Sequence, residues 1–386
     1  MWVFSFFDVV TLTVAPACVR RIVDDRLQEI GLERVRLPLG TCEQDKHIPI
    51  LISKDIINKR HVTVLFPDRY NDPAIFAYRV TGSEGVNVGS ICNFAKAVLH
   101  APQGDEQMGQ VSPDTPLVPS DTGLIIANPS QLIWYRAGQR AVTDREWTNL
   151  PRASMVHEAM RIHPIRSRVE GNTTFQEHIA YLFRHILDNQ QFVSSEAKLS
   201  ILGIEYVGSE VMSYLGRNWS SWSDRISSIT LFTPQHSISE ILPAPLNNDP
   251  EIEKSTAAFR NFVSTRTRVY ILSSEPIDQP LAGRDRYGSN VYSSGESLYD
   301  ENVIIRAWPA VLDWVELCYK YPEREEMEHH IPDADGEEGR ENGGGVERRA
   351  STVKKRLRTA EVRDMDVSEL QDGVDGICLD QPDDGP

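Results

Sequence analysis

The chain has 386 residues, of which 40% are hydrophobic, enough for one large α/β domain followed by a tail. It carries 56 Asp and Glu against 40 Lys and Arg, a formal net charge of -16. This balance argues against a sequence-independent grip on nucleic acid phosphates, although a local basic patch is compatible with it. The five cysteines are scattered and lack Cys-x-x-Cys spacing: Cys18, Cys42, Cys92, Cys318 and Cys378. This pattern does not fit a disulfide scaffold or a zinc site, and we expect no metal or cofactor.

The first seventeen residues are apolar and end in a segment, Ala15-Pro-Ala17, that mimics a signal-peptide cleavage site. No positive charge precedes the apolar run, Asp8 interrupts it, and it is too short to span a bilayer. We therefore expect residues 1–15 to be an irregular start to the chain, with a buried strand or a secretory signal as alternatives.

The hydrophobic pattern from residue 16 onward alternates helices with short apolar strands. Residues 16–30 have helical spacing and end at Gly31, and a second helix is expected over residues 88–100. Pro49 suggests that the strand over residues 48–53 lies at a sheet edge. The predicted strands of this first half cover residues 35–39, 48–53, 62–66 and 123–127, the last two resembling buried parallel strands.

The second half begins with a helix that opens at the capping box Thr174-x-x-Glu177 and has core residues at helical spacing. His178 and His185 lie on its polar side, where we expect both to face solvent. Strands are predicted at residues 199–202, 226–232 and 268–272, and helices at 207–215, 259–265 and 311–319; residues 281–301 look like a long loop. The alternation predicts an α/β domain whose mostly parallel sheet is flanked by helices on both faces.

One strand–turn–helix resembles the nucleophile elbow, Gly-x-Ser-x-Gly, of α/β-hydrolases. Gly203 ends the strand over residues 199–202, and Gly208 lies at the start of the following helix. Glu205 occupies the position of the nucleophilic serine. A carboxylate cannot be activated by histidine as an alcohol can, so the elbow geometry looks retained and acyl transfer looks lost.

The other catalytic positions also look empty. No Gly-x-Ser-x-Gly occurs in the chain, and the histidines after Glu205 are His236, His329 and His330. His236 comes too early for the closing loop of a triad. We expect Glu205 to have a structural role at the helix start, where a carboxylate satisfies backbone N–H groups and the helix dipole. Ser209 is the alternative, as a displaced nucleophile of a divergent serine hydrolase or esterase.

A glycine-rich stretch at residues 82–89 is the only sign of phosphate binding. It lacks the Lys-Ser/Thr of a phosphate loop and has neither Walker nor dinucleotide spacing. A nucleotide- or phosphate-binding protein is therefore a third hypothesis. The alternative is that this stretch is only a tight loop that leads into the next helix.

The composition changes after Pro322. Residues 323–345 and 364–386 are acidic, with too few apolar residues to fold, so we expect 323–386 to be a disordered tail behind a domain at 16–322. Between them lies a candidate bipartite nuclear-localisation signal: Arg348, Arg349, Lys354, Lys355, Arg356 and Arg358. Ser351 follows Arg-Arg-Ala and is a phosphorylation candidate for a basophilic kinase.

Several stretches together resemble the fungal Argonaute-binding domain family, the type found in a subunit of the Argonaute siRNA chaperone complex. They are residues 31–40, 77–79, 85–90, 124–128, 131–134, 292–296 and 306–308. The resemblance covers roughly residues 16–322 and implies an α/β-hydrolase-like domain used for protein contacts. It also implies Argonaute or other silencing and chromatin subunits as partners, in siRNA-mediated heterochromatin assembly. The family supplies no catalytic residues.

These observations favour a non-catalytic adaptor, or pseudo-hydrolase, in the nucleus, the cytoplasm or both. We expect protein partners, with neither sequence-specific nucleic acid binding nor membrane association. The divergent hydrolase with a displaced nucleophile is the alternative.

Overall fold

The computed structural model describes residues 6–102, 117–151, 160–242, 250–329 and 331, with side chains described from Pro16 onward except at Ala101, Pro102 and Leu117. Within these residues a nine-stranded sheet has the order β1-β2-β6-β3-β9-β10-β11-β13-β12. Its strands are β1 (Leu32–Leu37), β2 (Ile48–Ser53), β3 (His61–Phe66), β6 (Thr122–Ile126), β9 (Lys198–Ile204), β10 (Ile226–Phe232), β11 (Thr267–Ile271), β12 (Pro280–Leu281) and β13 (Asn290–Ser293).

The centre of the sheet is parallel and only its two ends are antiparallel. The six strands from β6 to β13 in sheet order run parallel, whereas β1, β2 and β12 pair antiparallel to their neighbours. Every residue of β3 and β10 is buried, as expected for strands covered on both faces. The predicted α/β class with a mostly parallel sheet is confirmed.

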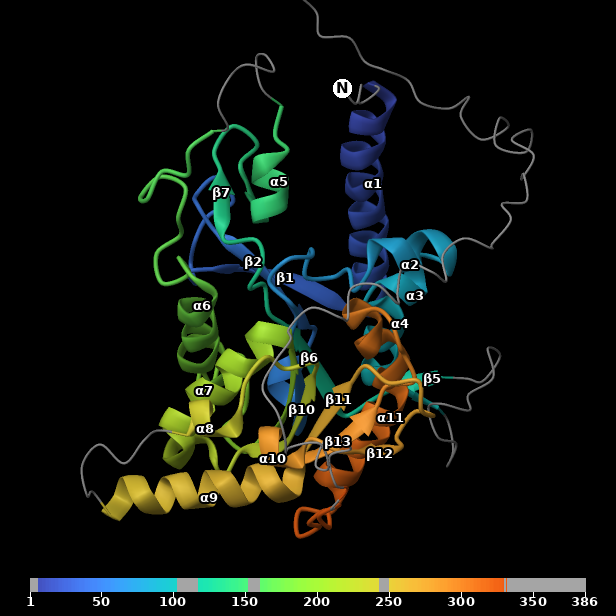
Figure 1. The fold of residues 1–386 in the computed structure, drawn as a ribbon. Coiled ribbons are helices and arrows are strands. Elements are labelled where there is room, and N and C mark those ends of the chain that lie inside the picture. Colours follow the sequence, from blue (N-terminus) through green and yellow to red (C-terminus); the bar gives the residue numbers. More distant parts are fainter. Residues whose placement is uncertain (1–5, 103–116, 152–159, 243–249, 330, 332–386) are drawn as a thin grey trace, which may run out of the picture. The chain divides into compact units, whose positions relative to one another are not determined.

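Helices cover both faces of this sheet (Figure 1). The long helices α1 (Phe6–Ile30) and α11 (Asp300–Lys320) share one face with α4 (Cys92–Leu99). The opposite face is covered by α6 (Phe175–Tyr181), α7 (Glu205–Trp222) and α9 (Pro250–Arg266). The sheet side chains alternate between the two cores: Val64 and Ile201 pack with α7, whereas Leu65 and Leu202 pack with α4.

Shorter elements fill the connections. The helical pieces are η1 (Ile56–Asn58), α2 (Tyr78–Ser83), α3 (Val86–Gly89), α5 (Asp144–Thr148), a π-helical turn η3 (Leu182–Leu187), α8 (Ile238–Ile241) and α10 (Arg284–Tyr287). Two hairpins lie outside the main sheet: β4 (His100–Pro102) with β5 (Leu117–Pro119), and β7 (Ile133–Tyr135) with β8 (Arg140–Val142).

Three details of the sequence prediction were wrong. The strand with Pro49 is not an edge, because β1 lies outside it; Pro49 pairs only with Arg36, and β2 meets β6 through Leu51 and Ile52 alone. The stretch 281–301 is not one loop, because it contains α10 and β13. The start of the chain is not irregular throughout, because α1 already begins at Phe6.

The end of the domain also lies beyond the expected boundary at Pro322. Residues 323–329 return to the sheet, where the Glu326 carboxylate accepts hydrogen bonds from Arg268 Nε at 2.9 Å and from Tyr292 Oη at 2.8 Å. Asn290 Nδ2 donates to the carbonyl of Met327 at 2.8 Å. These contacts bind a strap, residues 323–329, to β11 and β13.

Candidate functional site

The turn between β9 and α7 places Glu205 at the carboxyl edge of the sheet. Glu205 has a φ of +48°, a left-handed conformation that costs a residue with a side chain about 1 to 3 kcal/mol. A Cβ on Gly203 would lie 2.5 Å from Gly208 Cα, and one on Gly208 would lie 2.7 Å from the Gly203 carbonyl carbon. Strand and helix therefore touch through backbone alone, which requires glycine at both positions. This is the geometry of a nucleophile elbow, with Glu205 in the position of the nucleophile.

The Glu205 carboxyl group lies in an environment that disfavours its charge. Burial raises its pKa to about 7, and the nearby carboxylates of Asp68, Asp300 and Glu301 also act to raise it. The Arg69 guanidinium opposes this rise. The carboxyl group forms no hydrogen bond or ion pair with any described residue. At neutral pH the Glu205 carboxyl group is therefore protonated in part of the molecules and ionised in the rest.

The expected hydrogen bonds from the first N–H groups of α7 to the Glu205 side chain are not observed, although Glu205 lies in the first turn of the helix. A side chain reaches the first N–H groups of a helix from the N-cap position, and Ile204 occupies that position here. Glu205 comes one residue later, and its carboxyl group does not accept from those N–H groups. The first N–H groups of α7 therefore have no side-chain acceptor at the N-cap.

A serine and a histidine meet beside the elbow, contrary to the sequence analysis. Ser209, one turn into α7, has its Oγ 2.9 Å from His236 Nδ1. The same oxygen accepts from the Gln235 N–H at 2.9 Å and donates to the Glu205 carbonyl at 3.2 Å. The sequence predicts that His236 comes too early in the chain for a triad, but β10 lies directly beside β9, so the segment after β10 begins next to α7.

Among the described residues, no side chain completes a triad with this pair. The other ring nitrogen, His236 Nε2, is buried and has no hydrogen-bond partner in the part of the chain that the structure describes. Burial lowers the pKa of His236 to about 4, so the imidazole is neutral at pH 7. A catalytic histidine is oriented by a carboxylate at its second nitrogen. The Ser209–His236 bond instead ties the segment after β10 to α7.

The structure also places His178 and the glycine-rich stretch, two other features singled out in the sequence. His178 is fully buried rather than solvent-facing: its Nε2 accepts from the Asn128 N–H at 2.9 Å, and Nδ1 lies 2.7 Å from Asn172 Oδ1. Burial lowers its pKa to about 3. The glycine-rich stretch 82–89 forms parts of α2 and α3, and Gly89 is in close contact with Thr81. The basic cluster at 348–358 and Ser351 lie outside the described residues.

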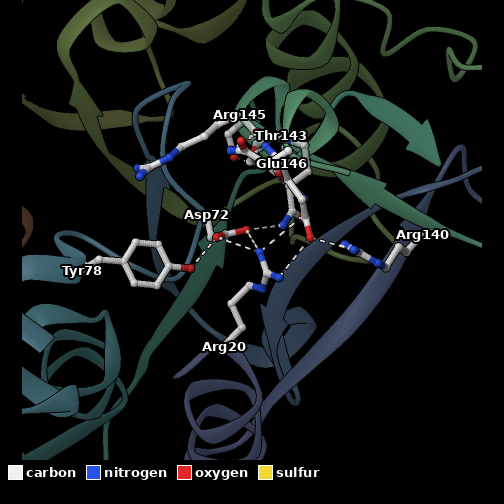
Figure 2. A network of polar contacts seen from close by, with 11 residues as sticks. Arg20, Asp72, Tyr78, Arg140, Thr143, Arg145 and Glu146 are labelled. Atoms are coloured by element: carbon white, nitrogen blue, oxygen red, sulfur yellow. Dashed lines mark hydrogen bonds and ion pairs between the residues drawn. The ribbon is translucent and has the colours of Figure 1, made fainter. Parts of the chain in front are cut away.

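A second polar site, which the sequence analysis missed, includes residues from the segments that follow β3 and β6, at the same edge of the sheet as the elbow. Figure 2 shows this site from close by. Arg20 of α1 points between two carboxylates, and its Nη1 lies 3.1 Å from Asp72 while its Nη2 lies 3.1 Å from Glu146. Arg140 of β8 pairs with Glu146 at 2.7 Å. Asp72 also accepts from Tyr78 Oη at 2.5 Å and from Gln131 Nε2 at 2.7 Å. We call these six residues the Arg20 network.

The Arg20 network borders a cavity of about 530 Å³. Its walls come from α1, β1, β2, the loop between β1 and β2, and the β7–β8 hairpin, together with the segments that follow β3 and β6. No sequence motif marks this site, because Arg20 lies 52 and 126 positions from its two acidic partners.

The described residues contain no group of three or more His, Cys, Asp or Glu side chains arranged to hold a metal ion. None of the described helices is long and apolar enough to cross a membrane.

The open parallel sheet, its helices on both faces and the sharp turn at Glu205 define an α/β-hydrolase-like domain. The Arb2 domain matches residues 12–277, and the chain belongs to this family. No curated protein matches the sequence.

Among solved structures, the histone deacetylase Clr3 aligns with a TM-score of 0.39 and 11% identity over 78% of this chain and 38% of that chain. The haloalkane dehalogenase DatA from Agrobacterium tumefaciens C58 aligns with a TM-score of 0.35 and 8% identity, covering 75% and 97%. A bacterial heroin esterase aligns with a TM-score of 0.33 and 9% identity, covering 81% and 92%. This chain thus spans 38% of the length of the deacetylase.

Proposed function

We propose that this protein is a non-catalytic adaptor, a pseudo-hydrolase that binds Argonaute or another subunit of a silencing or chromatin complex. One observation carries the proposal: the strained position that presents a nucleophile in a hydrolase elbow is occupied by Glu205. Its family membership supports a role in protein contacts.

The surface around the elbow is suited to a protein partner. Tyr206, next to Glu205, is 47% exposed and Tyr70 is 51% exposed. The Arg69 guanidinium carbon lies 4.8 Å from the centre of the Tyr70 ring and 5.6 Å from the centre of the Tyr206 ring. Leu298, 72% exposed, lies just before Asp300, whose charge acts on Glu205. Exposed apolar and aromatic side chains that gather at one edge are typical of protein interfaces.

The test is affinity purification of the tagged full chain from its own cells, followed by mass spectrometry. The proposal predicts recovery of Argonaute or other silencing or chromatin subunits, and their loss with the double change Tyr206→Ala and Leu298→Ser. Ile165→Ser is the matched control, because Ile165 is also 72% exposed and lies on another loop. Recovery of no such subunit, or equal loss with the control, would contradict the proposal.

The second candidate function is a divergent serine hydrolase, which the 2.9 Å contact between Ser209 Oγ and His236 Nδ1 favours. A fluorophosphonate probe distinguishes the two functions, because it labels an activated serine. We expect no labelling that depends on Ser209. Labelling of the wild-type chain that disappears in Ser209→Ala would establish the hydrolase and overturn the adaptor.

The proposed location is the nucleus, alone or together with the cytoplasm, through the basic cluster at residues 348–358. Residues 323–386 fused to a fluorescent reporter should enter the nucleus, and Lys354→Ala with Lys355→Ala should prevent entry. Ser351→Asp should weaken it, because a negative charge within the cluster opposes binding of an import receptor. Unchanged entry of the lysine variant would contradict this role.

A further inference from the structure

The cavity beside the Arg20 network lies where α/β sheets of this kind bind ligands. Asp72 follows β3 and Asn128 follows β6, so both lie at the carboxyl edge of the parallel strands. Open α/β sheets bind ligands in crevices outside this edge. A volume of about 530 Å³ is within the usual range of small-molecule sites.

Positive charge gathers in this cavity although the chain as a whole carries a net charge of -16. Arginines reach it from three elements that are separate in the sequence: Arg20 and Arg21 from α1, Arg34 and Arg36 from β1, and Arg140 from β8. Guanidinium groups repel one another, so their convergence requires counter-charges or a bound anion.

Three of these arginines are neutralised by carboxylates of the domain. Arg20 and Arg140 pair with Glu146, and Arg20 also pairs with Asp72. Arg34 pairs with Asp24 of α1. These pairs fix one wall of the cavity and leave no charge unmatched there.

The other two arginines have charge available for a ligand. Arg21 forms no hydrogen bond or ion pair with any described residue. Arg36 lies 3.6 Å from Glu43, a carboxylate whose side chain is 77% exposed. An ion pair of this length at the surface contributes little, so an incoming anion can displace Glu43.

We propose that this cavity binds a phosphate monoester, with Arg21 and Arg36 as its ligands and Glu43 as an internal competitor for Arg36. Each guanidinium can donate two parallel N–H bonds to phosphate oxygens. Two such groups match the two negative charges of the dianion, whereas a single carboxylate would use only one of them. This site is separate from the elbow surface, so either proposal can fail without the other.

Isothermal titration calorimetry on the full chain tests the site with free phosphoserine, with a phosphoserine peptide, with its unphosphorylated form and with succinate. We expect saturable binding of both phosphate probes, and an affinity reduced at least about tenfold by Arg21→Gln together with Arg36→Gln. Glu43→Gln should increase the affinity about threefold, because the competitor is lost. A peptide that binds more tightly than phosphoserine identifies a protein segment as the source of the phosphate, and equal affinities identify a small monoester.

Arg217→Gln is the control, because Arg217 is an exposed arginine of α7 outside the cavity, and it should leave the affinity unchanged. An increase in phosphate affinity in Glu43→Gln cannot arise from misfolding, so this variant keeps the test decisive. The proposal is overturned if neither phosphate probe binds, if Glu43→Gln binds no more tightly than wild type, or if the arginine variant binds as well as wild type. Equal binding of succinate would assign the cavity to carboxylates instead.

Discussion

The elbow and the Arg20 network lie at the same edge of the sheet and differ in whether their charged groups have partners. In the Arg20 network each charged group has a partner at 3.1 Å or less, and the side chain of Asp72 is only 9% exposed. At the elbow the Glu205 carboxyl group has no partner among the described residues, and its backbone is strained. The network contributes stability, whereas the elbow reduces it. Strained backbone positions cluster at functional sites, so the elbow is the better indication of function.

The largest effect is expected where the elbow brings two backbones together. Gly208→Ala places a Cβ 2.7 Å from the carbonyl carbon of Gly203, which neither the strand nor the helix can avoid by moving a side chain. The free energy of unfolding should fall by about 3 kcal/mol or more, measured by urea denaturation. Gly82→Ala in α2 is the control: nothing lies within 4 Å of its Cβ, so stability should be unchanged or slightly higher. A loss below about 1 kcal/mol in Gly208→Ala would show that the close contact is not rigid.

Removal of the central charge of the Arg20 network should destabilise the fold. Arg20→Met leaves the largely buried Asp72 carboxylate without a guanidinium and leaves Glu146 with Arg140 alone, and it should cost about 2 kcal/mol. Arg21→Met, at the next position of the same helix, removes no pair and should stay within about 0.5 kcal/mol of wild type. Chemical denaturation at pH 7 measures both. Equal effects of the two changes would mean that the network contributes nothing.

Removal of the charge at the elbow should instead stabilise the fold. The pKa of Glu205 is about 7 in the folded protein and about 4.3 in an unfolded chain, so the folded state binds more protons between these values. Stability therefore falls as the pH rises from about 4.5 to 7. Glu205→Gln does not titrate and should be more stable than wild type at pH 8, by about 2 kcal/mol after allowance for its partial exposure.

Unfolding free energies at pH 5 and pH 8 provide the measurement. The advantage of Glu205→Gln should be small at pH 5 and full at pH 8, while Glu196→Gln, a change at an exposed glutamate, should alter neither value. The same difference at both pH values would rule out titration of Glu205 as its cause.

The smallest effect is expected at the Ser209–His236 contact. Ser209→Ala removes the acceptor of the Gln235 N–H and the partner of His236 Nδ1, and should cost about 1 kcal/mol. Ser213→Ala, on the same helix, loses only an exposed contact with Arg217 and should cost less than about 0.5 kcal/mol. If the two variants are equally stable, the contact does not hold the segment after β10 in place.

The architecture could be predicted because buried parallel strands are continuous apolar runs, as in β3 and β10. The strand β13 was missed because two of its four buried residues are polar: Asn290 and Ser293 have their hydrogen bonds within the fold. Glycine spacing located the elbow, since close backbone contact leaves no substitute for glycine. The burial of His178 was missed because its partners, Asn128 and Asn172, belong to other segments.

The candidate site was only partly predictable. The contact between Ser209 and His236 depends on which strand lies beside β9, and sheet order is not contained in local spacing. The Arg20 network and the cavity depend on a helix, a hairpin and two segments after strands meeting in space. Only the assembled fold brings those side chains together.

The strap has a practical consequence for expression. Ending the recombinant protein at Pro322, where the composition changes, would delete Glu326 and leave the Arg268 guanidinium, 15% exposed, with Asp278 as its remaining acidic neighbour. Such a truncation should yield less soluble material than one that ends after Ile331. Preparations intended for crystallisation should therefore retain residues 323–331.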